Sequence, residues 1–167
     1  IVSGTGDNGV FPYLKHFALN DQETWRSVYL ATWATEQATR EIYLKAFEVC
    51  VKEAQSTIKY ISDENGTVAN KTIRSTLGIM SAQCCIGGTI GFAHYGLLTG
   101  VLRNEWGFTG GVVTDFYPNS LVNTRDMMLR AGGDMWMTSA MMGGGIPAYD
   151  YDSPTIRAIM REAIHHI

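Results

Sequence analysis

The sequence holds little of what marks several common classes of protein. It has three cysteines among 167 residues, too few for a disulfide framework, and the adjacent Cys84 and Cys85 lack the paired spacing of a zinc site. No run of lysine or arginine occurs and the formal net charge is -3, so a nucleic-acid partner is not expected. No apolar stretch is long enough to span a bilayer, so a membrane partner is not expected either. We also expect no metal and no other cofactor.

What remains is the composition of a folded protein. Hydrophobic residues make up 46% of the chain, which suffices for a single domain with a substantial core over residues 1–167. The first residues carry neither the basic region nor the apolar run of a secretion signal. Any such segment would lie outside this chain, so the sequence is compatible with an extracellular or a cytoplasmic location.

Apolar segments and turns alternate in a way that predicts strands followed by helices. Short apolar runs of strand type occur at Val10–Leu14, Leu77–Ser81, Gly111–Thr114 and Asp134–Met137. Apolar residues at helical spacing occur at Thr39–Ala54, Ala93–Glu105, Thr124–Arg130 and from Pro154 onward, after the N-cap residue Ser153. Loops or turns are predicted at Gly4–Gly9, Ser62–Gly66 and Met141–Tyr151. This order is typical of βα units around a parallel sheet, so we predict an α/β fold.

One carboxylate stands at the end of the third predicted strand. Asp115 directly follows Gly111–Thr114, and the carboxyl ends of parallel strands are where ligands and catalytic groups collect. An equally good interpretation from the local sequence is an aspartate that caps the next helix. The other predicted strands are also followed by polar residues, namely Lys15 and His16, Ser81 to Gln83, and Thr138 and Ser139. Right-handed crossovers would gather all of them on one rim, which favours a functional role for Asp115.

Three segments resemble glycoside hydrolase family 3, the β-glucosidase family, and the resemblance covers nearly the whole chain. Lys15 to Thr24 is similar to that family's Lys-His-Phe segment, Arg40 to Lys45 to its following helix, and Leu97 to Asp115 to its Trp-Gly-Phe segment, which ends in Ser/Thr-Asp. The family's first domain is a (β/α)8 barrel or a variant of it. The resemblance therefore implies a partial (β/α)8 TIM barrel of about four βα units, because a complete barrel typically needs about 250 residues.

The resemblance also implies a reaction. The aspartate of the family motif is the nucleophile in retaining hydrolysis of O-glycosidic bonds, and this role would belong to Asp115. A retaining glycosidase needs one ionised carboxylate to attack the anomeric carbon and a second carboxyl about 5 Å away that serves as acid and base. By similarity, the residues that contact the sugar would be Lys15, His16, Arg26, Met80 and Phe116, the last in place of the family's tryptophan. The expected substrate is a β-linked glucoside or oligosaccharide.

Each of these residues also has a simpler structural interpretation. Lys15 could be a surface lysine, His16 a core histidine, Arg26 a partner of Glu23, and Met80 a core residue. Taken singly, neither interpretation is preferred. Because the polar residues occur together in the family's order, we favour the functional interpretation.

Departures from the family pattern restrict what this chain can do alone. The family commonly has an aromatic residue and then Asn-Arg after its Met-Ser-Ala segment, where this chain has Gln83, Cys84 and Cys85. The family's acid/base glutamate usually comes from a following domain, and further sugar ligands lie upstream. We therefore expect a piece of a β-glycosidase that is inactive in isolation and needs the rest of the barrel and a following domain. The alternatives are a non-catalytic sugar-binding or structural half-barrel, and a half-barrel that associates with a second half.

Overall fold

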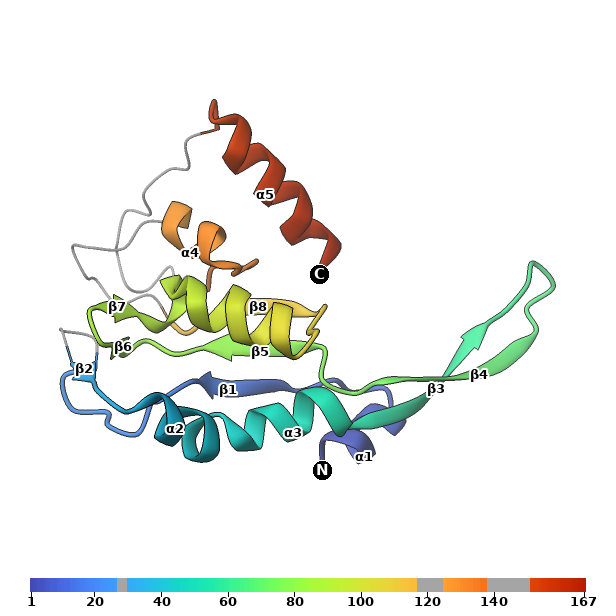
Figure 1. The fold of residues 1–167 in the computed structure, drawn as a ribbon. Helices are drawn as coiled ribbons and strands as arrows, with labels where there is room; N and C mark the ends of the chain where they lie inside the picture. The colour runs from blue at the N-terminus through green and yellow to red at the C-terminus, as the bar shows by residue number, and fades with distance from the viewer. Residues whose placement is uncertain (27–29, 117–124, 138–150) are drawn as a thin grey trace.

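The core of the fold is a small parallel sheet. The computed structural model describes residues 1–26, 30–116, 125–137 and 151–167. Strands β1 (Tyr13–Phe17), β5 (Gly78–Ser81) and β8 (Gly111–Thr114) are all parallel and lie in the order β1-β5-β8 (Figure 1). Met135 adds one parallel bridge to Val113 on the far side of β8. The predicted α/β fold with a parallel sheet is therefore confirmed.

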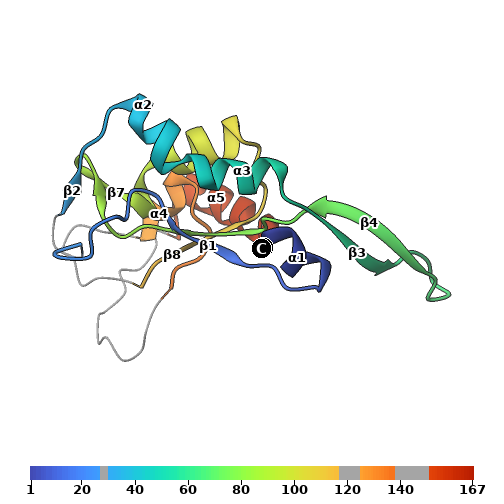
Figure 2. The same ribbon diagram turned by 90° about the horizontal axis from the view of Figure 1, so that it is seen from below.

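Helical segments connect the strands and cover the sheet. Between β1 and β5 lie α2 (Glu36–Ala38), η1 (Thr39–Tyr43) and α3 (Lys45–Glu53), which form one nearly continuous helical run. Thr35 begins this run because its hydroxyl accepts a hydrogen bond from Ala38 N at 3.2 Å. Further along the chain are η3 (Gly96–Glu105), α4 (Arg125–Ala131) and α5 (Pro154–His165). In Figure 2, α2 and α3 lie on one side of the strands.

Two apolar clusters hold these layers together. The larger joins the sheet to α3 and η3, and its fully buried members include Phe17, Leu44, Ile79, Leu98 and Leu102. The smaller joins α4 and α5 to the short helix η2 (Gly91–Ala93) through Phe92, Met128, Leu129 and Ala163. Arg40 also ties the first helical run to η3, because it donates two hydrogen bonds to Glu105, at 2.7 and 3.0 Å. Glu105 therefore contributes to the packing of η3 against the first helical run.

Smaller elements surround this body. Helix α1 (Val2–Asp7) begins the chain, and a second sheet is formed by β2 (Ala31–Thr32), β6 (Cys85–Ile86) and β7 (Thr89–Ile90). Strands β3 (Gln55–Ile61) and β4 (Val68–Arg74) form an antiparallel hairpin that projects away from the body (Figures 1 and 2). Within the described residues, no helix combines the length and the apolar character needed to cross a bilayer.

Strand β8 reaches its position through a tight approach of two backbones. Gly111 N donates to the carbonyl of Leu77 at 3.0 Å, and a Cβ on Gly110 would collide with that same carbonyl. Glycine at position 110 therefore allows the chain to enter β8 beside β5. All four residues of β8 are buried, which explains why an uninterrupted apolar run predicts this strand with its correct bounds.

Several local expectations need correction. The first strand begins later than predicted, so Lys15 and His16 lie within β1 rather than after it. Gly4–Gly9 contains most of helix α1 instead of a loop, and Asp134–Met137 contributes a single bridge instead of a strand. Ser153 precedes α5 as predicted, but its hydroxyl contacts the Thr155 hydroxyl at 2.9 Å and caps no backbone amide. The turn at 62–66 is confirmed, whereas 138–150, which includes Thr138, Ser139 and most of the predicted 141–151 loop, lies outside the described residues.

Candidate active site

Asp115 lies at the end of β8 with only 4% of its side chain exposed. Its Oδ2 atom accepts a hydrogen bond from Arg26 Nη1 at 2.6 Å and lies 3.3 Å from His16 Nε2. Its Oδ1 atom accepts from the backbone N–H of Phe116 at 2.8 Å. The structure thus brings together three of the predicted site residues from two distant parts of the sequence.

Arg26 connects the buried carboxylate to a polar loop. Besides the bond to Asp115, its Nε lies 2.6 Å from Glu23 Oε2, and Asn20 Nδ2 donates to Glu23 Oε1 at 3.0 Å. The sequence left two interpretations of Arg26, a partner of Glu23 or a member of the Asp115 site. In the structure Arg26 contacts both carboxylates. Asn20 was not among the predicted site residues, although its spacing of three from Glu23 in a polar segment is the signal that would have found it.

His16 lies beside Asp115 in surroundings that favour the neutral imidazole. Burial is the largest influence on its pKa and lowers it below 6.5, Asp115 opposes this shift, and Lys15 and Arg26 add to it. His16 Nε2 lies 3.3 Å from Asp115 Oδ2, and in the neutral imidazole an unprotonated Nδ1 can accept a hydrogen bond from Asn20 Nδ2, which lies 3.5 Å away.

The side chains of the other predicted site residues, Lys15, Met80 and Phe116, make no hydrogen bond or ion pair with Asp115. Lys15 is exposed on β1, and no hydrogen bond or ion pair joins it to another described residue. Met80 is half-buried in β5 beside Val113. Phe116 is 52% exposed. Its backbone carbonyl accepts a hydrogen bond from the buried side-chain amide of Gln83. Gln83 therefore fixes the backbone directly after Asp115.

Cys84 packs against the segment that follows β1. Its Sγ is completely buried and lies 3.1 Å from the carbonyl of Leu19, and burial raises the pKa of this thiol to about 11. Because the thiolate is the reactive form, we predict that iodoacetamide at about pH 8 modifies Cys50, which is partly exposed, and leaves Cys84 unmodified in the native protein. Mass spectrometry of peptides before and after unfolding in urea would measure this. Equal rates at the two residues in the native protein would contradict the prediction.

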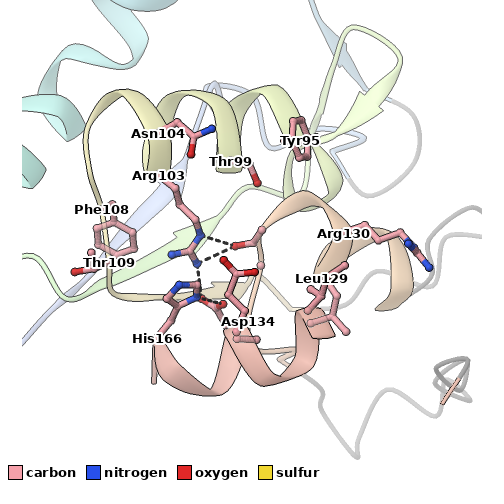
Figure 3. A pocket seen from close by; sticks show the side chains of 15 residues that line it. Tyr95, Thr99, Arg103, Asn104, Phe108, Thr109, Leu129, Arg130, Asp134 and His166 are labelled. Carbon is pink, nitrogen blue, oxygen red and sulfur yellow. Dashed lines mark hydrogen bonds and ion pairs between the residues drawn. The ribbon is translucent and has the colours of Figure 1, made fainter. Parts of the chain in front are cut away.

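A second polar cluster occupies the opposite end of β8. Asp134 is 2% exposed; its Oδ2 accepts from Arg103 Nη2 and from the backbone N–H of Val112, both at 2.7 Å, and its Oδ1 lies 2.8 Å from His166 Nδ1. Arg103 also donates to the carbonyls of Gly110 and Gly132. Figure 3 shows Arg103 reaching from η3 toward Asp134, with His166 at the end of α5 beside it.

This cluster borders a cavity of about 390 Å³ between η3, α4 and α5 (Figure 3). Arg103 and both Asp134 oxygens already form hydrogen bonds within the protein. These bonds hold the end of α5 and the start of β8 in place. Across the described ranges, no three His, Cys, Asp or Glu side chains are grouped as ligands for a metal ion. Within the described residues, we therefore take the Asp115 cluster as the candidate active site.

Known proteins are similar to this chain in sequence and in fold. No family model matches the chain. β-Glucosidase B of Emericella nidulans is 35% identical over 136 residues, which are 81% of this chain and 13% of that protein. The solved structure of β-glucosidase 3B from Thermotoga neapolitana in complex with glucose covers 99% of this chain with a TM-score of 0.73 and 29% identity. The family 3 β-glucosidase of Bifidobacterium adolescentis covers 99% with a TM-score of 0.70 and 30% identity.

These relatives are much longer than the chain. It spans 13% of the Emericella protein and 21% of each of the two solved chains. Nearly all of its own length, by contrast, is matched in the solved structures, and the match extends through β1, β5 and β8. The chain is therefore a relative of the β-glucosidases of glycoside hydrolase family 3 and corresponds to a part of their length.

Proposed function

We propose that the chain is a portion of a retaining β-glycosidase in which Asp115 is the nucleophile and the substrate is a β-linked glucoside or oligosaccharide. The observation that carries this proposal is the buried carboxylate at the end of a parallel strand, held by Arg26 and His16 from a segment about ninety positions earlier. The β-glucosidase relatives supply the reaction class.

The two oxygens of Asp115 differ in a way that suits nucleophilic attack. Oδ2 is engaged by Arg26 and lies near His16, so the guanidinium compensates the negative charge of the ionised carboxylate. Among the described residues, Oδ1 accepts only the N–H of Phe116, so it keeps lone-pair capacity. In the proposed step Oδ1 bonds to the anomeric carbon while the bond to the leaving oxygen breaks. A carboxyl group from outside this chain protonates that oxygen.

Sugar recognition would use the groups around this carboxylate. Lys15 is exposed and bonds to no other described residue, so it can donate to a sugar hydroxyl without losing a contact within the protein. The exposed ring of Phe116 offers an apolar face for the sugar ring. Met80, half-buried in the central strand, would border the same subsite. Arg26 is bonded to both Asp115 and Glu23, and would therefore position the nucleophile as well as bind sugar.

The architecture supports a part of a (β/α)8 barrel. Three parallel strands and the bridge at Met135 provide four parallel positions, about half of the eight that close a barrel. We expect the isolated chain to be inactive, because a second carboxyl and the remaining strands would come from elsewhere.

Two observations favour a second candidate function, a non-catalytic sugar-binding relative. The Oδ2 contact with Arg26 is short and buried, as in an ion pair that only stabilises the fold, and Gln83 stands where the family commonly has an aromatic residue. In that case the complete protein would bind glucose-like ligands without turning over a β-glucoside.

Covalent trapping separates the two candidates. The complete protein, with this segment included, is treated with an activated 2-deoxy-2-fluoro-β-glucoside, which slows hydrolysis of the glycosyl-enzyme. We expect the label on the peptide that contains Asp115. A label on another residue would overturn the assignment, and sugar binding with neither label nor turnover would support the non-catalytic candidate.

A further inference from the structure

Gln83 connects the ends of the two strands that lead to Asp115. It follows β5 by two positions and is 5% exposed. Its Nε2 atom donates a hydrogen bond to the backbone carbonyl of Phe116, which follows β8 by two positions. Because Ser81 and Thr114 are paired in register, Gln83 and Phe116 stand equally far beyond their strands. Gln83 therefore extends the contact between β5 and β8 past the last paired residues.

The backbone on both sides of the Asp115 carboxylate is held from the β5 segment. Asp115 N donates to the carbonyl of Ser81 at 3.1 Å, and Gln83 holds the carbonyl of Phe116. The N–H of Phe116 lies between these two anchors and donates to Asp115 Oδ1 at 2.8 Å. The side chain of Gln83 therefore acts on the carboxylate through the backbone of Phe116.

This arrangement affects the oxygen that would attack the sugar. Arg26 engages Oδ2 of Asp115 at 2.6 Å, so in the proposed step Oδ1 forms the bond to the anomeric carbon. Oδ1 is oriented by the N–H of Phe116. A misplacement of a reacting atom by about 1 Å can slow a reaction about 100-fold. A side chain that holds Phe116 in place thus determines how Oδ1 approaches the sugar.

On the basis of the function proposed above, we propose that Gln83 is a positioning residue for the nucleophile. Its amide holds the backbone of Phe116, so that the N–H of Phe116 directs Oδ1 of Asp115 toward the anomeric carbon. Gln83 itself touches no substrate and takes part in no bond change. The family commonly has an aromatic residue at this position, which has no amide to donate, so the role belongs to the glutamine of this chain.

Gln83→Met removes the donor and keeps a side chain of similar length. In the complete protein we expect kcat for an aryl β-glucoside to fall about 10- to 100-fold, with KM changed less than about threefold. The groups that bind the sugar remain, and only the approach of Oδ1 is disturbed. The rate at which a saturating activated 2-deoxy-2-fluoro-β-glucoside labels Asp115 should fall by a similar factor. A kcat within about twofold of that of the unsubstituted protein would overturn the positioning role.

The labelling experiment also separates the role of Gln83 from the proposed function. If the unsubstituted complete protein carries no label on Asp115, the proposed function fails and the role of Gln83 fails with it. If Asp115 is labelled equally fast in Gln83→Met and in the unsubstituted protein, only the role of Gln83 fails.

Gln83→Glu distinguishes a hydrogen-bond donor from a side chain that only fills space. A protonated carboxyl can donate to the carbonyl of Phe116, whereas an ionised one can only accept. Burial at this position should raise the pKa of the introduced carboxyl above its ordinary value of about 4.3. We therefore expect kcat of Gln83→Glu, relative to that of the unsubstituted protein, to rise several-fold as the pH is lowered from about 7.5 to about 5.

The same ratio for Gln83→Met should not change with pH. The titratable and charged groups of the site, His16, Glu23 and Arg26, are present in all three proteins, so the ratios report on position 83. A ratio for Gln83→Glu that stays as constant as that for Gln83→Met would contradict the role of Gln83 as a donor.

Thr76→Val is the matched control for the loss of a buried side-chain hydrogen bond. Thr76 is 3% exposed, and its hydroxyl donates to the carbonyl of Cys50 at 2.7 Å, near the start of β5 and away from Asp115. We expect a lower thermal midpoint with kcat unchanged. If Thr76→Val lowers kcat as much as Gln83→Met does, the loss in Gln83→Met reflects general destabilisation, and the positioning role is overturned.

Discussion

Replacing Asp115 by asparagine in the complete protein is expected to lower kcat for an aryl β-glucoside by roughly four orders of magnitude. The amide keeps an acceptor for the N–H of Phe116 but cannot form the glycosyl ester, so the covalent step is lost. Steady-state rates with a nitrophenyl glucoside measure the change. The matched control is Asp126→Asn, which weakens the ion pair with Arg130 on α4 and should retain near-normal activity.

Rescue by a small anion separates a nucleophile from a structural ion pair. In Asp115→Gly the side chain is absent, so azide can occupy its place and attack the anomeric carbon directly. We expect azide to restore measurable turnover and to yield a glycosyl azide of inverted anomeric configuration. If Asp115→Asn lowers activity by less than tenfold, the catalytic assignment is contradicted. If the variant is unfolded at the assay temperature, its loss of activity does not support the assignment. A circular-dichroism melt therefore accompanies the kinetics.

The parts of the fold that sequence reasoning predicts well are those in which burial is uniform. The four residues of β8 are all buried and apolar except for a terminal threonine, so they read as a strand with correct bounds. The helical run through α3 is predicted by its apolar spacing. On its exposed face Glu48 forms salt bridges with Lys45 at 3.0 Å and with Lys52 at 3.1 Å, at spacings of three and four residues that stabilise a helix.

The β3–β4 hairpin escapes prediction because most of its residues are exposed. Its strands contain polar side chains on both faces, so neither shows the apolar alternation of a half-buried strand. The prediction of a strand at Asp134–Met137 is wrong for a different reason. Its apolar composition suits a strand, but the buried carboxylate of Asp134 bonds to Arg103 and to the backbone of Val112, which leaves only Met135 in a strand-like bridge.

Part of the candidate site could be predicted from the sequence. The positions of His16, Arg26 and Asp115 follow from motifs, and the structure brings these three side chains into contact. That Glu23 and Asn20 support Arg26 depends on the path of a loop, which no periodic pattern encodes. The second cluster at the opposite end of β8 was not predicted, because Arg103, Asp134 and His166 are far apart in sequence and form no short motif.

That second cluster leads to the largest expected effect on stability. Asp134→Ala in the complete protein should lower the free energy of unfolding by about 3–5 kcal/mol, because it leaves the largely buried guanidinium of Arg103 without its carboxylate. It also removes the acceptor for Val112 N at the entry of β8 and the contact with His166 that fastens the end of α5. Urea unfolding followed by tryptophan fluorescence would measure the loss.

A matched substitution separates this effect from the general cost of losing an aspartate. Asp126→Ala removes a carboxylate whose partner Arg130 lies on the same helix and is substantially exposed, so it should cost less than about 1 kcal/mol. Arg103→Met in the Asp134→Ala background removes the unpaired charge and should recover part of the stability, because an apolar pair avoids burying a charge without a partner. If Asp134→Ala and Asp126→Ala unfold at the same urea concentration, the cluster does not stabilise the fold. In that case the attachment of α5 rests on the apolar contacts of Ile156 and Ala163.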